Sequence, residues 1–160
     1  MAKVHERLYV DAPFTQTLGA LEARLGITDG RPGTSRLTLV LPISEHHDIV
    51  RTVDARSARK IDTSGYTSRF QIAWQAGATS RGLPTPGFTG DLVLSAGEDY
   101  AESLLQIEGS YDPPGGLAGR AFDEAVGRRI AHATLAALLA GIGDELRADH
   151  LRLEAAKGAR

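Results

Sequence analysis

A chain of 160 residues with 42% hydrophobic and 24% charged residues has the size and composition of one globular domain that buries a core, rather than of a disordered segment. Its formal net charge is -2 and its basic residues are scattered, which excludes the basic surface that nucleic acid or an anionic membrane surface requires. It has no cysteine, which excludes disulfides, thiolate metal sites and cysteine nucleophiles.

The N-terminal segment predicts a strand followed by a short helix. Apolar and polar residues alternate from Lys3 to Val10, as in a strand with one buried face. Asp11-Ala12-Pro13 is a helix-start signal with Asp11 as the cap, and apolar residues follow at helical spacing. These helical apolar residues are Phe14, Leu18, Leu21 and Leu25. We expect the helix to end near Gly26 and a loop to continue to Ser35.

Runs with a period of two fill the middle of the chain and predict an antiparallel sheet. Their same-face residues are Leu37, Leu39 and Leu41; Ile49, Arg51 and Val53; Phe70, Ile72 and Trp74; Phe88, Leu92 and Leu94; and Leu105, Ile107 and Tyr111. The first two runs suggest a hairpin. A weaker short strand is expected from Arg59 to Thr63, so that the sheet has about seven strands with the opening one.

The chain from about Leu117 onward has helical periodicity and predicts one long C-terminal helix. One side of it carries Phe122, Val126, Ile130, Ala133, Ala137 and Gly141, and the apolar arc extends to Leu135, Leu138, Leu139 and Ile142. Such a wide arc implies extensive burial against the sheet. The small residues on it either enlarge a cavity or let the sheet approach closely. Residues 144–160 are rich in charge and are expected to project from the domain or fray.

The order of strand, short helix, sheet and long helix resembles the SRPBCC, or helix-grip, superfamily. This superfamily includes START lipid-transfer domains, birch-pollen-allergen-like proteins, polyketide cyclases and coenzyme Q-binding proteins. Residues 88–94 and 103–111 look like the paired last strands of its bacterial branch. Residues 112–119 and 122–134 look like the approach to its final helix and that helix itself. The chain departs from the superfamily in lacking an obvious second short helix between Gly26 and Ser35.

The resemblance implies an α+β helix-grip fold as a single START-like domain over residues 1–160. A curved antiparallel sheet of about seven strands would wrap around the long C-terminal helix, with a short helix after the first strand. Because the superfamily hosts several functions on one scaffold, the fold alone does not decide among them.

The leading expectation is a non-enzymatic carrier or sensor. It would bind or transport a small hydrophobic ligand, such as a lipid, quinone or polyketide-like molecule, in a cavity between sheet and helix. No catalytic residue, metal or cofactor is assigned. One alternative is an enzyme of the polyketide cyclase or aromatase kind, with Glu6 as the group for proton transfer. Another is a protein-interaction module without ligand, docking through its sheet or charged helix end.

The expected cavity lining combines apolar positions with two inward-facing charges. Glu6 and Arg51 share a strand parity with apolar residues, which aims them at the interior unless they extend to solvent at a sheet edge. The proposed lining residues are Glu6, Arg51, Phe70, Trp74, Leu105, Ile107, Tyr111, Phe122, Val126, Ile130, Ala133 and Ala137.

Three other features of the sequence are weaker candidates for a functional site. The cluster Glu45-His46-His47-Asp48 has metal-ligand chemistry, but neighbouring strand residues point to opposite faces, so a solvated hairpin turn is favoured. His132 is predicted to be a surface histidine of the long helix. The glycines of residues 115–119 lack the lysine and spacing of a phosphate loop.

No segment has the apolar run of a signal peptide or the ~20 apolar residues of a membrane span. We therefore expect a soluble cytoplasmic protein without integral membrane association, with a small hydrophobic ligand and no nucleic acid as partner. The composition is also compatible with a homodimer.

Overall fold

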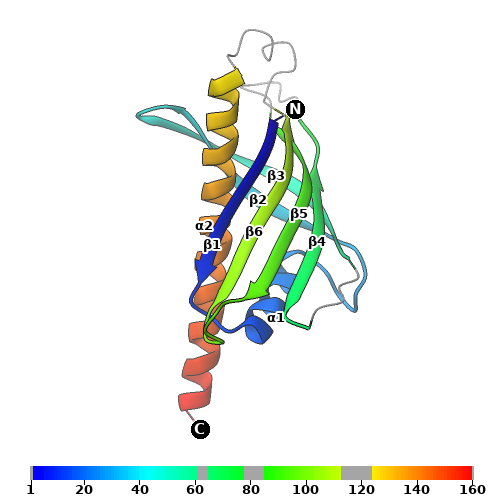
Figure 1. Cartoon of the computed structure of the whole chain (residues 1–160), viewed down its shortest axis with the longest axis vertical. Coiled ribbons are helices and arrows are strands. Elements are labelled where there is room, and N and C mark those ends of the chain that lie inside the picture. Colours follow the sequence, from blue (N-terminus) through cyan, green and yellow to red (C-terminus); the bar gives the residue numbers. More distant parts are fainter. Residues whose placement is uncertain (1, 61–64, 78–84, 113–123, 160) are drawn as a thin grey trace.

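The computed structural model describes residues 2–60, 65–77, 85–112 and 124–159. They form one antiparallel sheet and two helices (Figure 1), which confirms the predicted α+β helix-grip fold. In chain order the elements are β1 (Ala2–Val10), α1 (Phe14–Arg24), β2 (Gly33–Ser44), β3 (His47–Arg59), β4 (Thr67–Trp74), β5 (Gly87–Ala96), β6 (Ser103–Asp112) and α2 (Glu124–Gly158).

The described part of the sheet has six strands, in the spatial order β1-β6-β5-β4-β3-β2. The prediction of a separate strand from Arg59 to Thr63 is wrong for the residues that can be followed. Arg59 is the last residue of β3 and pairs with Phe70 of β4. Burial alternates without a break from Ile49 to Ser57, and His47–Arg59 form one long strand where the sequence predicts two shorter ones. Residues 61–64 lie outside the described chain.

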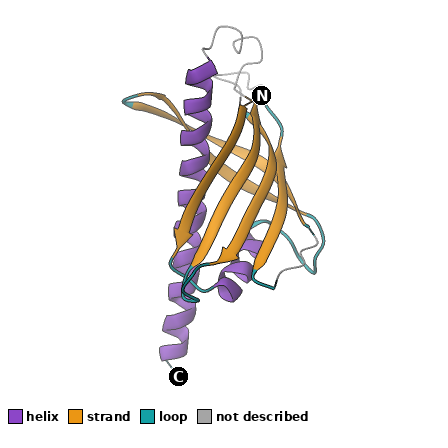
Figure 2. Ribbon diagram, in the orientation of Figure 1, coloured by secondary structure: helices purple, strands orange, loops and turns teal. Residues whose placement is uncertain are grey.

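The sheet curls into a half-barrel, and α2 closes its open side (Figure 2). α2 packs mainly against β1 and β2, which are the two edge strands of the sheet. The helix therefore covers the inner face of the sheet and lies along both free edges. This arrangement buries a continuous apolar core between sheet and helix, as a two-layer domain requires.

Strand parity decides which residues enter that core. Phe70 of β4 lies opposite Leu92 of β5, and Leu92 lies opposite Ile107 of β6. All three side chains are fully buried. Their neighbours in sequence point to the outer face, since side chains alternate along a strand. The predicted inward orientation of these strands is confirmed.

The short helix after the first strand is also confirmed, but its start differs from the prediction. Pro13 is the N-cap residue of α1 and no side chain caps the helix, so Asp11 is not the cap. The backbone carbonyl of Pro13 instead accepts hydrogen bonds from the Thr17 amide and, at 2.8 Å, from its hydroxyl. After Leu25, Gly26 adopts a φ of +72°, a conformation that suits glycine and ends the helix. No second helix follows in residues 26–32.

The predicted buried face of α2 is correct for Leu135, Leu138, Leu139 and Ile142 but wrong for the stripe of small residues. Ala133 and Gly141 are exposed, and Ala137 is half-buried. The face turned to the sheet carries the larger side chains of the apolar arc, together with Ala131 and Thr134. Its buried residues are Ala131, Thr134, Leu135, Leu138, Leu139, Ile142 and Leu146. The free energy gained by burial grows with apolar area, so leucine and isoleucine outweigh a stripe of small residues.

The charged C-terminal part of α2 stays helical to Gly158 and extends beyond the sheet (Figure 1). Its first turns dock on α1 through polar contacts. Arg24 of α1 forms ion pairs with Glu145 at 2.8 Å and Asp149 at 3.2 Å. Beyond His150 every described residue is exposed. The projection predicted for this segment is therefore observed, in helical form.

Candidate functional site

Three aromatic residues form a row on the inner face of the sheet. Trp74 of β4 lies opposite Phe88 of β5, and Phe88 lies opposite Tyr111 of β6. The rings of Trp74 and Phe88 are stacked with their centroids 4.9 Å apart, and the Trp74 indole donates a hydrogen bond to the Pro86 carbonyl at 2.9 Å. The row is a rigid apolar wall across three strands. We call it the aromatic row.

Two glycines explain how the Phe88 ring lies against the sheet. Gly90 of β5 and Gly109 of β6 are opposite each other, next to the aromatic row. A Cβ added to either residue would lie 2.8–2.9 Å from Cζ of Phe88. The Phe88 ring therefore packs directly on the glycine backbone, and a side chain at either glycine would displace the ring. This close approach is a packing reason for glycine inside a strand.

Tyr111, at the end of the aromatic row, is fully buried, yet its hydroxyl makes no hydrogen bond with any described residue. Burial raises the pKa of Tyr111 to about 12, and the neighbouring Thr134 hydroxyl partly offsets this rise. Thr134 gives its own proton to the Ile130 carbonyl at 2.7 Å. Tyr111 is thus a neutral donor in a mostly apolar setting, with the Thr134 hydroxyl oxygen beside it.

A groove lies on the outer face of the sheet beside the aromatic row, where β3 and β4 separate. β3 and β4 pair only where Arg56–Arg59 lies opposite Phe70–Ala73, so the preceding part of β3 diverges from β4. A cavity of about 700 Å³ occupies the gap. Its lining includes the inward-facing Val53 and Trp74 as well as the outward-facing Thr52. Most of the other lining residues on the strands also face outward, and Val53 and Trp74 are only 6% and 3% exposed, so the cavity is a groove on the outer face of the sheet.

Glu6 faces α2 as its parity predicted, but its carboxylate is not free. Glu6 Oε1 lies 2.6 Å from Nδ1 of His132. His132 lies at the surface of α2, as predicted, with its side chain 43% exposed, and its ring also ties the middle of α2 to β1. Sequence reasoning missed this pair because 126 residues separate the two. Residues at that separation carry no local signal of contact.

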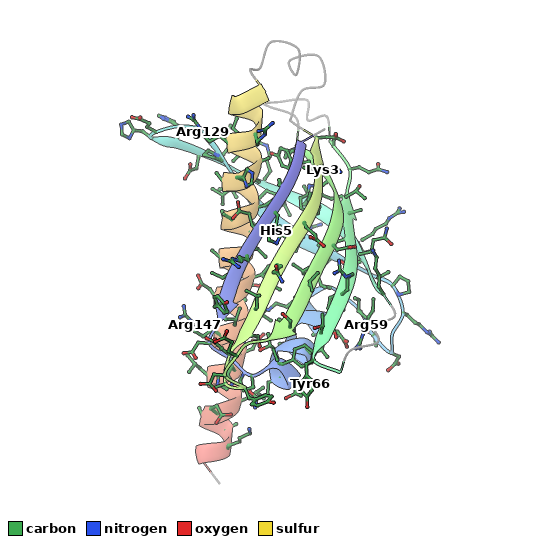
Figure 3. All side chains as sticks on the ribbon, in the orientation of Figure 1. Lys3, His5, Arg59, Tyr66, Arg129 and Arg147 are labelled. Carbon is green, nitrogen blue, oxygen red and sulfur yellow. The ribbon has the colours of Figure 1, made fainter. Side chains whose placement is uncertain are left out.

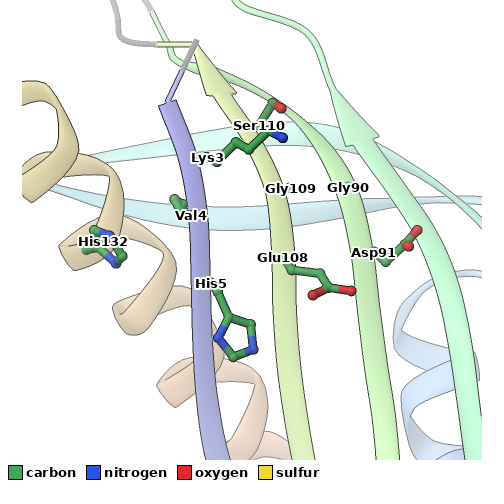
Figure 4. A pocket seen from close by; sticks show the side chains of 9 residues that line it. All are labelled: Lys3, Val4, His5, Gly90, Asp91, Glu108, Gly109, Ser110 and His132. Carbon is green, nitrogen blue, oxygen red and sulfur yellow. The ribbon is translucent and has the colours of Figure 1, made fainter. Parts of the chain in front are cut away.

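A second, more open depression, with a volume of about 620 Å³, lies over the N-terminal half of β1. Figure 4 shows Lys3, His5, Glu108 and Asp91 around it, with His132 on α2 on the far side of β1. Six of the nine residues that line it are charged or polar. It is not the apolar cavity that the sequence predicted.

Arg51 of β3 lies on the inner face, as predicted, and is half-buried. Its guanidinium donates one hydrogen bond, from Nη1 to the neighbouring Val50 carbonyl at 3.2 Å. The Nε atom is buried and has no hydrogen-bond partner in the described chain. No carboxylate of the described residues lies within ion-pair distance of Arg51.

Charges on the outer face are mutually neutralised. Asp91 of β5 binds Lys60 at 2.8 Å and Arg69 of β4 at 3.1 Å, and Arg69 also binds Glu108 of β6 at 2.9 Å. Burial raises the pKa of Asp91, but hydrogen bonds from Lys60 and Arg69 outweigh it and leave the pKa below its ordinary value. Figure 3 shows how densely polar side chains cover the outside of the domain. This outer network is a structural feature rather than a vacant site.

The structure brings only part of the predicted lining together. Phe70, Trp74, Leu105, Ile107 and Tyr111 are buried on the inner face. Ile130 is half-buried on α2. Ala133 is exposed, and Ala137, although half-buried, lies outside the sheet-facing arc, so neither belongs to a lining. Phe122 lies outside the described residues, and nothing is described of the Val126 side chain.

The residues of the β2–β3 turn hold no metal site. Glu45, His46, His47 and Asp48 are exposed, as expected for a solvated turn. Across the described ranges, no three histidine, aspartate or glutamate side chains are placed to share a metal ion. Within the same ranges, neither helix has an apolar stretch long enough to cross a membrane.

A scan against protein-family models gives no match to this chain, and a search of curated proteins finds none with significant sequence similarity. The fold is therefore established by its geometry, and the resemblance to the helix-grip superfamily stays a prediction.

Proposed function

We propose that this protein binds a small hydrophobic molecule between the inner face of its sheet and α2, and holds the polar end of that molecule through Tyr111. The observation that carries the proposal is the fully buried Tyr111 hydroxyl, which makes no hydrogen bond of good geometry with any described residue although the Thr134 hydroxyl lies beside it. A buried donor without an acceptor costs about 1–3 kcal/mol of stability. A ligand that supplies a carbonyl or hydroxyl oxygen removes this cost when it binds.

The surroundings of Tyr111 suit an apolar ligand. The aromatic row supplies a flat wall, and Phe88 lies directly between Trp74 and Tyr111. Ligand sites of this kind are mostly apolar and use a few polar groups to orient the bound molecule. The four buried side-chain polar atoms without a partner in the described chain are all on residues with inward-facing parity. They belong to Ser35, Arg51, Ser57 and Tyr111.

The groove where β3 and β4 separate lies beside this wall. Trp74, the first residue of the aromatic row, is 3% exposed and is among the residues that line the groove. We propose that a ligand enters here, where the two strands are not paired.

The test is ligand binding by the wild type and by Tyr111→Phe. Native mass spectrometry and calorimetry with a panel of lipids, quinones and polyketide-like aromatics are expected to identify a ligand with an oxygen acceptor. The Tyr111→Phe variant should bind it about tenfold more weakly, since one neutral hydrogen bond contributes about 0.5–1.5 kcal/mol. Tyr9→Phe, at an exposed position of β1, is the matched control and should leave affinity unchanged.

Two results would contradict the proposal. One is that no member of the panel binds. The other is that Tyr111→Phe binds the ligand as tightly as wild type, which would mean that the hydroxyl does not contact it.

A further inference from the structure

Among the described residues, the half-buried arginines form ion pairs with carboxylates, with one exception. Three arginines are half-buried among the described residues: Arg24, Arg51 and Arg69. Arg24 is neutralised by two carboxylates, those of Glu145 and Asp149.

Arg69 is likewise neutralised by two carboxylates, those of Asp91 and Glu108. Arg51 has none in the described chain, and its buried Nε atom lacks any acceptor. Charged groups that leave water are normally paired, because an uncompensated charge loses its hydration without replacement. The expected anion is therefore missing only at Arg51.

Arg51 has inward parity on β3, so an anion that paired with it would lie on the inner face of the sheet. Arg51 has the same parity on β3 as the buried Val53, and it lies opposite the fully buried Leu39 of β2. Glu6 is an inward-facing carboxylate of the sheet, but it is bound to His132 at the opposite edge. An anion at Arg51 would thus have apolar side chains on either side of it.

We infer that Arg51 binds the anionic head of an amphipathic ligand, a carboxylate or phosphate group attached to an apolar body. This inference rests on the proposed function and specifies the chemical class of its ligand. A guanidinium is suited to this task because its planar N–H groups match the oxygens of a carboxylate or phosphate. The apolar body would lie along the inner face of the sheet.

The experiment compares three probes of equal chain length: decanoate, decyl phosphate and decanol. Calorimetry with the wild-type protein is expected to give at least about tenfold tighter binding of one or both anions than of the alcohol, as charge-assisted hydrogen bonds predict. The relative affinities of decanoate and decyl phosphate identify which head group fits. Decanol measures the contribution of the apolar body alone.

Variants at Arg51 assign the preference to this side chain. Arg51→Gln should abolish the preference for the anion while leaving the affinity for decanol unchanged, and Arg51→Lys should retain part of it. Arg7→Gln, an exposed arginine on the outer face of β1, is the matched control and should keep the preference.

Stability without ligand gives an independent readout. Arg51→Met should raise the Tm of the ligand-free protein by about 2–4 °C, because an unpaired, half-buried charge is replaced by an apolar side chain. A purely structural arginine would give a lower Tm instead. A fall in Tm would therefore contradict the inference even if a variant bound poorly for other reasons.

The outcomes separate this inference from the proposed function. Equal wild-type affinity for anions and alcohol overturns the anion site and leaves the hydrophobic site standing. An equal loss of preference in Arg51→Gln and Arg7→Gln also overturns it. Failure of all three probes, together with failure of the wider panel, overturns both proposals.

Discussion

Gly90 and Gly109 illustrate what single residues decide in this sheet. Each lies in a strand interior, where glycine is normally unfavourable because it has no side chain to pack. Here the Phe88 ring occupies the space that two side chains would take. The sequence contains both glycines plainly, but their pairing depends on the register between β5 and β6, which local patterns do not fix.

Gly90→Ala is predicted to destabilise the protein by about 2 kcal/mol or more. Its new Cβ would collide with the Glu108 carbonyl and lie 2.8 Å from the Phe88 ring, and overpacking of this kind typically costs 1–3 kcal/mol. Chemical denaturation measures the change. Gly141→Ala is the control, because Gly141 is exposed on α2 with open space around it. It should stabilise the helix by about 0.5–1 kcal/mol, and a comparable loss in both variants would contradict the packing argument.

At the scale of the element, α2 determines how much interior space the fold contains. Our sequence-based interpretation correctly predicted one long helix with a wide apolar arc. It placed the centre of that arc on the small residues Ala133, Ala137 and Gly141. The structure places it on Leu135, Leu138 and Ile142 instead. The helix therefore presents large side chains to the sheet, and the stripe of small residues lies outside that contact.

A pair of glutamate substitutions on α2 tests this orientation. Ala131→Glu should unfold the domain or cost at least about 3 kcal/mol, because it places a charge in a fully buried position. Ala133→Glu should change the free energy of unfolding by less than about 0.5 kcal/mol, since Ala133 is exposed. Circular dichroism during urea denaturation would measure both. The reverse order of effects would restore the face that the sequence suggested.

At the scale of the whole molecule, the sheet and α2 form one closed layer pair. The ion pairs of Arg24 fasten α1 to α2, and the contact of Glu6 with His132 fastens α2 to β1. On the outer face, Asp91 connects β5 to β4 and to Lys60 just after β3. β3 and β4 pair over only part of their length. In the described sheet, a cavity lies where this pairing is interrupted.

The outer network predicts a pH dependence of global stability. The pKa of Asp91 is lowered in the folded state, so its contribution is present above the ordinary aspartate pKa of about 4 and is lost as the pH falls through the lower folded value. Asp91→Asn should therefore reduce the free energy of unfolding at pH 7 by about 0.5–1 kcal/mol. The difference from wild type should shrink below pH of about 4.

The control for this prediction is Asp54→Asn. Its partner Arg36 and Asp54 itself are both about three-quarters exposed, and such surface pairs contribute little. Denaturation curves over the acid range would measure both variants. A difference at Asp91 that persisted unchanged at low pH would show that its charge is not the cause.

The sequence by itself determined the order of strand, short helix, antiparallel sheet and long helix, and the inward parity of Phe70, Trp74, Ile107 and Tyr111. These depend on periods of 2 and 3.6 residues, which are properties of neighbouring positions and can be read locally. Arg51 was likewise placed on the inner face by its parity with Val53.

Only the tertiary structure decided which of these positions lack a partner. Three features depend on distances between segments far apart in the chain. They are the contact of Glu6 with His132, the buried polar atoms of Tyr111 and Arg51 that have no hydrogen-bond partner in the described chain, and the separation of β3 from β4. The buried face of α2 belongs to this group too, because competition among side chains for contact with the sheet selects it. Long-range packing thus left two inward-facing polar groups, on Tyr111 and Arg51, with a buried atom that has no hydrogen-bond partner in the described chain, and the proposed ligand site rests on these two groups.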